Sequence, residues 1–202
     1  MPAKKIVSKE TIINKAFELL RKDGSSALNA RNIAKALNCS TQPIYLSFKN
    51  MGQLKESVDQ RAKDTYNSFL ENELKSGKYP PYKAYGMGYV RFAKEERELF
   101  KYVFMRDRTD DPNINDESEI KNVIEVICKQ TGYSYDEARM FHLEQWTFVH
   151  GIATMIATLY LDWDMNTVSA MISNAYNGLR HVYDERRKTD ASHKNDQSDK
   201  KI

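Results

Sequence analysis

The sequence has few of the features that mark secreted or membrane-spanning proteins. Only two of its 202 residues are cysteines, Cys39 and Cys128, so a disulfide framework is excluded and we expect free thiols. No stretch approaches the ~20 consecutive apolar residues that a membrane helix needs, since polar residues interrupt the longest apolar-rich run, Trp146 to Leu161. No apolar segment follows the N-terminal MPAKK, so we expect no secretory signal, no membrane partner and a cytoplasmic location.

Motifs for catalysis and for metal binding are also lacking. The sequence contains no Gly-rich phosphate loop, no nucleophile motif and no pair of acids that periodicity places in apolar surroundings. The histidines, His142, His150, His181 and His193, show no ligand spacing with cysteines or acids. We therefore expect a protein that is not an enzyme and that has neither a cofactor nor a metal site.

Helical periodicity dominates the sequence, and strand signals are absent. With 41% hydrophobic and 29% charged residues, the chain has the composition of a globular protein. We predict an all-α fold of about nine helices, with a three-helix head in residues 1–51, a six-helix body in residues 52–187 and a disordered tail in residues 188–202. The predicted helices span residues 9–22, 29–38, 40–48, 52–75, 82–95, 97–104, 117–131, 134–161 and 164–187, with a loop at 107–115.

The segment from Asn29 to Phe48 predicts two short helices joined by a tight turn. Asn29 is a suitable N-cap for the first helix, and Asn38 tolerates the left-handed conformation that a sharp helix end needs. Ser40 is placed to cap the second helix, in which Ile44 and Phe48 form one buried stripe. Two helices with a polar leading edge indicate a helix-turn-helix, although a surface helical hairpin would have the same pattern.

The distribution of charge favours the helix-turn-helix over the hairpin. Residues 1–50 hold nine Lys or Arg and three acids, a net charge of +6. The remaining residues hold 22 basic and 25 acidic side chains, a net charge of −3. A basic head on a slightly acidic body is expected if only the head contacts phosphate.

A longer series of residues in fixed order surrounds this segment. Its members are Ile13, Ala16, Phe17, Leu20 and Gly24, then Asn29, Arg31, Ile33 and Ala34, then Ser40, Ile44, Tyr45 and Phe48, and finally Asn50 and Leu54. This run resembles the DNA-binding domain of the TetR (tetracycline-repressor-like) family of one-component transcriptional regulators. Asn38 stands where that family usually has Gly, and Met51 where a phosphate-contacting Lys is common.

The resemblance implies that the third helix enters the major groove of operator DNA. At the opening and on the outer side of that helix, the candidates for contact with bases are Thr41, Gln42, Pro43 and Ser47, and Ser40 is a further candidate DNA contact. The candidates for contact with phosphates are Asn29, Arg31, Tyr45 and Lys49.

The two C-terminal helices, at about 135–161 and 164–186, are apolar around more than one narrow stripe. A helix that is apolar on nearly all sides must be buried on nearly all sides. Small residues, among them Gly151, Ala153 and Ala175, allow close approach of helices. We therefore expect a homodimer, and the resemblance implies a four-helix bundle formed by these two helices and their copies.

The middle of the body is rich in aromatic residues and predicts a cavity for a small molecule. The candidate ligand contacts are Tyr89, Phe92, Phe100, Val103, Trp146 and His150. Trp146-x-x-x-His150-Gly151 resembles a pattern in one branch of the family's C-terminal domains, but packing remains the favoured role for Trp146 and His150, with Gly151 as a close-contact point. The sequence places no carboxylate or Arg inside, so we expect an apolar or weakly polar ligand, aromatic or cationic, rather than a strongly anionic one.

These features predict a one-component transcriptional regulator, a repressor that binds palindromic operator DNA as a dimer and is released by a small, mostly apolar ligand. A DNA-binding protein without a natural ligand, or an activator, is the nearest alternative. A helical small-molecule carrier or enzyme without a DNA function is the alternative from another class.

Overall fold

The computed structural model describes residues 7–107, 109, 118 and 120–199, with side chains as far as Thr189. All regular elements in these residues are helical, which confirms the predicted all-α fold of about nine helices. They are α1 (Lys9–Asp23), a 3-10 turn η1 (Ser25–Ala27), α2 (Ala30–Ala36), α3 (Gln42–Ser47), α4 (Met51–Ser76), α5 (Pro81–Glu95), α6 (Arg97–Phe104), α7 (Lys121–Thr131), α8 (Tyr135–Ala157) and α9 (Met165–Asp199).

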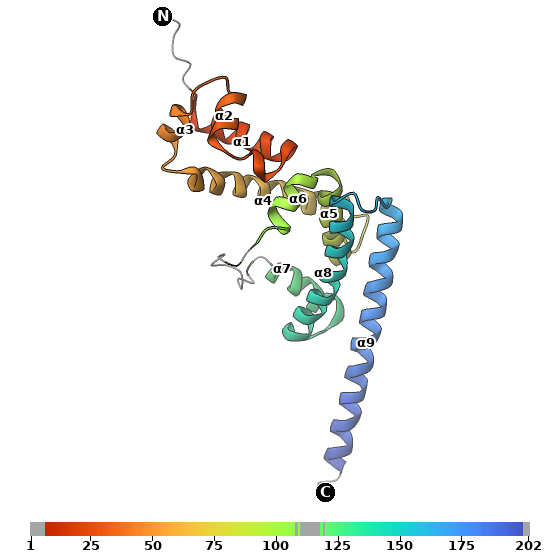
Figure 1. The fold of residues 1–202 in the computed structure, drawn as a ribbon. Helices are drawn as coiled ribbons and strands as arrows, with labels where there is room; N and C mark the ends of the chain where they lie inside the picture. Colours follow the sequence, from red (N-terminus) through yellow and green to blue (C-terminus); the bar gives the residue numbers. More distant parts are fainter. Residues whose placement is uncertain (1–6, 108, 110–117, 119, 200–202) are drawn as a thin grey trace, which may run out of the picture.

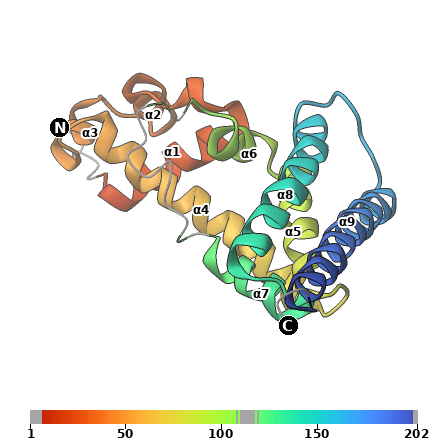
Figure 2. The same cartoon turned by 90° about the horizontal axis from the view of Figure 1, so that it is seen from below.

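The helices form a head and a body that share α4 (Figure 1). Helices α1, α2 and α3 form the head, and the long α4 leads from it into the body. Within the body, α5 packs against α4, α6, α7, α8 and α9. Seen from below, α8 and α9 lie side by side on the side of the body away from the head (Figure 2).

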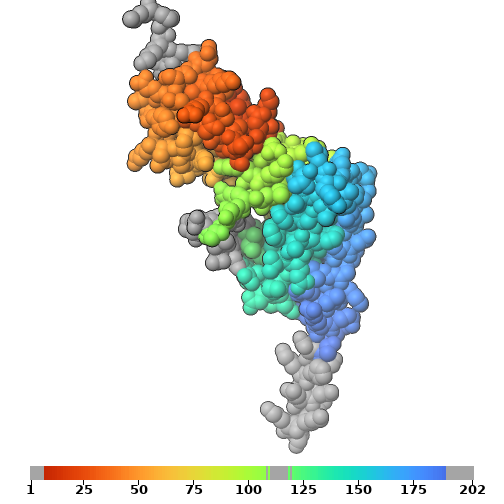
Figure 3. Space-filling view, viewed as in Figure 1, coloured from red at the N-terminus to blue at the C-terminus, as the bar shows by residue number. Residues whose placement is uncertain are grey.

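Two apolar clusters hold the chain together. The larger runs without a break from the head into the body, from Ile12 and Ile44 through Leu54 to Phe92 and Ile172. The smaller lies among α5, α7, α8 and α9 and is rich in rings: Tyr82, Tyr133, Phe141 and Tyr183 surround Ile124 and Ile127. In the space-filling view the head and the body appear as two lobes in contact (Figure 3).

Local capping explains where several helices begin and end. The Asn29 side chain accepts a 2.9 Å hydrogen bond from the Asn32 N–H and caps α2 as predicted. Asn38 has φ 52°, and the N–H groups of Asn38 and Cys39 donate to the last carbonyls of α2, which confirms the predicted left-handed helix end. Ser134 and Glu137 form the capping box predicted at the start of α8.

Three predicted boundaries are corrected. Ser40 does not cap α3: the helix starts at Gln42 without a side-chain cap, because Pro43 already removes one of the N–H groups that need a partner. Helix α8 ends at Ala157 rather than near Leu161, because Leu159 takes the left-handed conformation at φ 60°. Helix α9 continues past residue 187 to Asp199, and no Pro or Gly interrupts this part of the sequence. Most of the predicted loop at 107–115 lies outside the described residues.

Candidate functional site

Helix α3 has a buried inner side and an exposed outer side. Ile44 and Phe48 are buried against the head as predicted, while Gln42 and Lys49 are exposed. Two large side chains on the outer side contribute little to the core: Tyr45 is 57% exposed and Leu46 is 78% exposed. Leu46 was not among the predicted contacts, because it lies between the residues of the buried stripe and carries no polar group. Its exposure adds an apolar group suited to a thymine methyl.

The other predicted DNA contacts lie around α3 with different degrees of exposure. Ser40 and Arg31 are exposed, whereas Asn29, Thr41, Pro43 and Ser47 are half-buried. The Asn29 side chain is already engaged, since its Oδ1 caps α2 and its Nδ2 donates to the Ser26 carbonyl at 3.3 Å. Asn29 therefore has a structural role at the start of α2.

The end of α1 is docked on α6. Glu96, which is 6% exposed, accepts hydrogen bonds from the Arg21 guanidinium at both carboxylate oxygens, one of them from Nε at 2.6 Å. Gly24, with φ 79°, ends α1, and a Cβ there would lie 2.6 Å from Oε2 of Glu98. Only glycine therefore fits this close approach without a shift of the Glu98 side chain.

Helix α4 is docked on α1 as well. The Arg61 guanidinium lies over the Phe17 ring at 5.2 Å and donates to the Asn14 side chain. Helix α1 of the head therefore contacts α4 and α6, which are two of the helices that border the body's cavity.

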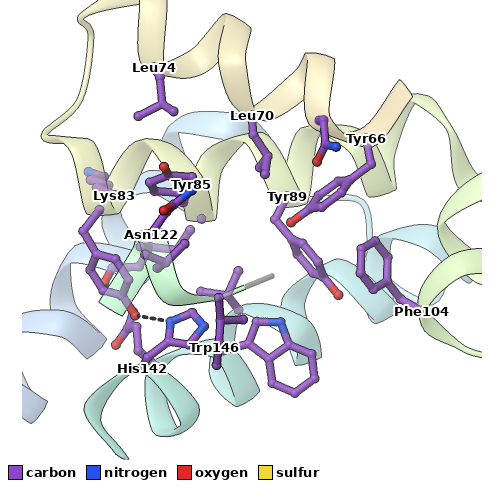
Figure 4. Close-up of a pocket in the computed structure, with 18 of the residues that line it drawn as sticks. Tyr66, Leu70, Leu74, Lys83, Tyr85, Tyr89, Phe104, Asn122, His142 and Trp146 are labelled. Carbon is purple, nitrogen blue, oxygen red and sulfur yellow. Dashed lines mark hydrogen bonds between the residues drawn. The ribbon is translucent and has the colours of Figure 1, made fainter. Parts of the chain in front are cut away.

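The body contains a cavity of about 1700 Å³ bordered by α4 to α9. Drug-sized ligand sites are typically about 300–1,000 Å³, so the space suits a large or elongated molecule. Aromatic side chains from α4, α5, α6 and α8 line it, as the close-up shows (Figure 4): Tyr66, Tyr85, Tyr89, Phe104 and Trp146.

Half of the predicted ligand contacts belong to the wall of this cavity. Tyr89, Val103 and Trp146 line it. The other three do not belong to the wall: Phe92 and Phe100 are fully buried in the core, and His150 does not line the cavity. Helical periodicity marked these residues as inward-facing, but it does not distinguish a cavity wall from the packed layer behind it.

The cavity wall also carries charged groups, so the expectation of a wall without carboxylates or Arg is corrected. Asp59 of α4 accepts hydrogen bonds from the Tyr102 hydroxyl and, at 3.3 Å, from the Arg106 guanidinium. The hydrogen bond between Asp59 and Tyr102 links α4 to α6. Glu56 and Arg139 are further charged lining residues.

Two histidines of α8 stand near tyrosines of α5. Nδ1 of His142 is 3.1 Å from the Tyr82 hydroxyl, and burial lowers the pKa of His142 to about 4. Nδ1 of His150 is 2.7 Å from the Tyr89 hydroxyl, and burial also lowers the pKa of His150. Both imidazoles are therefore neutral at pH 7.

The outer side of α8 and α9 is partly apolar and open. Phe148 and Met155 of α8 and Val182 of α9 are exposed. A Cβ added at Gly151 or Gly178 would meet nothing within 4 Å, so the predicted close contact at Gly151 does not occur within the chain. Both glycines leave room for the close approach of another helix.

In the described part of the chain, no helix is both long and apolar enough to cross a membrane, and no three His, Cys, Asp or Glu side chains gather into a metal-binding group. Neither a protein-family model nor a curated protein sequence matches the chain. The geometry of the head and of the cavity is therefore the basis for assigning a function.

Proposed function

We propose that the protein is a cytoplasmic one-component transcriptional regulator of the TetR type, a repressor that binds palindromic DNA as a homodimer. The observation that carries the proposal is the outer side of α3, where Gln42, Tyr45 and Leu46 are exposed, with the exposed Lys49 just after the helix, in a head of net charge +6. A short helix with an exposed polar and apolar outer side, preceded by a packed helix and a tight turn, suits entry into the major groove.

The proposed dimer is formed by α8 and α9 with their copies. The exposed Phe148 and Met155 and the open positions at Gly151 and Gly178 support it, because they provide apolar area and room for close helix approach. A two-fold axis through this face places two heads on one duplex, with half-sites about 34–36 Å apart or a small multiple of that distance.

The proposed switch is a small, mostly apolar ligand in the cavity. Phe104 and Asp59 line the cavity from the two helices, α6 and α4, on which α1 is docked. A ligand that favours one arrangement of these helices changes the spacing of the heads, and a hundredfold preference corresponds to about 2.7 kcal/mol per site.

The test is the affinity of the full chain for duplex DNA from the promoter next to its own gene. Gln42→Ala is expected to lose about 1–3 kcal/mol of discrimination at an adenine and to relax sequence preference there. Lys49→Ala is expected to weaken binding to all sequences alike and to reduce the dependence on salt by about one charge. If both variants lose affinity uniformly, the assignment of roles on α3 is wrong.

The affinity for promoter DNA also separates the regulator from the second candidate function, a small-molecule carrier without a DNA function. The size of the cavity is the observation in favour of that candidate. A carrier retains ligand binding but binds promoter DNA no more tightly than unrelated DNA of equal length.

A further inference from the structure

Trp146 and His150 lie one turn apart on α8 and stack on each other. Their ring centroids are 4.9 Å apart with an interplanar angle of 22°. The Trp146 side chain lines the cavity and is 38% exposed, whereas His150 is half-buried and does not line it. One face of the indole is therefore covered by the imidazole, and the indole still borders the open space of the cavity.

The imidazole of His150 is fixed from three further directions. Burial raises the pKa of Tyr89 and lowers that of His150, so a protonated phenol faces a neutral imidazole, and the Tyr89 hydroxyl and Nδ1 share a 2.7 Å hydrogen bond. Nε2 of the same ring lies 3.4 Å from Oγ1 of Thr154. The ring of Phe100, from α6, lies 5.9 Å away at 31°.

We propose that Trp146 is the stacking surface for a planar aromatic group of the ligand, and that His150 is the positioning residue that holds Trp146 and Tyr89 in place. This inference rests on the proposed function, because it names the class of ligand for the same cavity. The two residues of Trp146-x-x-x-His150 then have different roles. The indole of Trp146 contacts the ligand, and the imidazole of His150 supports the indole.

The other aromatic rings that line the cavity favour the same class of ligand. Phe104 lies 4.8 Å from Tyr89 and 5.0 Å from Tyr66, and all three side chains line the cavity. The Trp146 side chain is a hydrogen-bond neighbour of Tyr89, so a flat ring stacked on the exposed part of the indole has these aromatic side chains beside it. Such aromatic contacts are expected to increase affinity by about two- to tenfold over a saturated ring of the same size.

The test compares 2-naphthol with decahydro-2-naphthol, which share a carbon skeleton and a hydroxyl group and differ in planarity and aromaticity. Calorimetric titration of the full chain is expected to show about two- to tenfold tighter binding of 2-naphthol. Trp146→Leu is expected to remove this preference while decahydro-2-naphthol still binds. The matched control is Trp163→Phe, at the other tryptophan, which does not line the cavity and is expected to leave the preference intact.

Two substitutions test His150. His150→Ala removes both the stacking partner of Trp146 and the hydrogen-bond partner of Tyr89, so 2-naphthol should lose most of its advantage. His150→Phe keeps a ring beneath Trp146 and is expected to restore the advantage in part. Unchanged binding of decahydro-2-naphthol and an unchanged circular dichroism spectrum show that the cavity and the fold persist in each variant.

The proposal is overturned if the preference for 2-naphthol is absent, if it survives Trp146→Leu, or if His150→Ala leaves it unchanged. Measuring promoter binding with the same protein preparations shows whether a failure concerns the stacking surface or the proposed function. A chain that prefers 2-naphthol but binds no DNA supports the stacking surface and contradicts the regulator. A chain that binds DNA without this preference contradicts the stacking surface alone.

Discussion

Replacing Gly151 or Gly178 by alanine tests the proposed dimer, because the substitution is expected to affect the stability of the dimer and the stability of the single folded chain in opposite directions. Gly151 and Gly178 lie inside α8 and α9, and a Cβ at either position meets nothing within the chain. Replacing Gly by Ala inside a helix stabilises the helix by about 1 kcal/mol. Each variant is therefore expected to keep its fold and to gain helix stability.

The effect on the dimer has the opposite sign. A methyl group inserted into a closely packed helix contact costs about 1–3 kcal/mol, and a two-fold interface contains each glycine twice, so the cost is about 2–6 kcal/mol. The dissociation constant is then expected to rise by about 30-fold to about 10⁴-fold, since each 1.4 kcal/mol is tenfold. Sedimentation equilibrium measures the dissociation constant, and circular dichroism measures the helix content.

Gly86→Ala is the matched control. Gly86 also lies inside a helix, α5, and its added Cβ would make ordinary contacts of 3.6–3.9 Å with Ile172 and Val149, away from the outer side of α8 and α9. It is expected to leave the dissociation constant unchanged. If Gly151→Ala and Gly178→Ala behave like Gly86→Ala in sedimentation, the interface lies elsewhere on the molecule and the argument from the open glycines is refuted.

Three further predictions concern stability. Arg21→Ala is expected to lower the free energy of unfolding in urea by about 1–3 kcal/mol, because it leaves the buried carboxylate of Glu96 unpaired. The loss is no larger because the Arg21 side chain is 57% exposed, so solvent partly screens the ion pair. Leu159→Gly is expected to raise the melting temperature, because glycine adopts φ 60° without strain. Leu159→Ala is not expected to raise it, because alanine keeps a Cβ and therefore the strain. His142 binds a proton more readily in the unfolded chain, so the free energy of unfolding should fall by at most about 3 kcal/mol as the pH drops from 6.5 to 4, and His142→Gln should remove this slope.

Each of these predictions has a contradicting result. Unchanged unfolding of Arg21→Ala in urea would show that the ion pair does not hold α1 on α6. Equal melting temperatures for Leu159→Gly and Leu159→Ala would show that the backbone at this position is not strained. A pH slope that survives in His142→Gln would assign the proton uptake to another group.

The sequence predicted best what local chemistry decides. The cap at Asn29, the left-handed end at Asn38 and the capping box at Ser134 each depend on a few neighbouring residues, and all three are confirmed. The end of α8 was missed because Leu159 adopts a conformation that leucine rarely takes, so no residue type signals it.

The candidate site was predicted less completely because it depends on which helices face each other. The spacing of Trp146 and His150 placed both on one side of α8, but only the position of Tyr89 on α5 decides which ring borders the cavity. The exposure of Leu46 likewise depends on how α3 is packed against α1, which periodicity within α3 does not fix.

Selection of bound duplexes from a random-sequence DNA library by the full chain tests the proposed function most directly. The expected result is enrichment of a palindrome whose half-sites are about 34–36 Å apart or a small multiple of that distance, bound at least about 10³-fold more tightly than unselected DNA. Enrichment of no sequence, with all duplexes bound equally weakly and only in proportion to their charge, would contradict a DNA-reading role for α3.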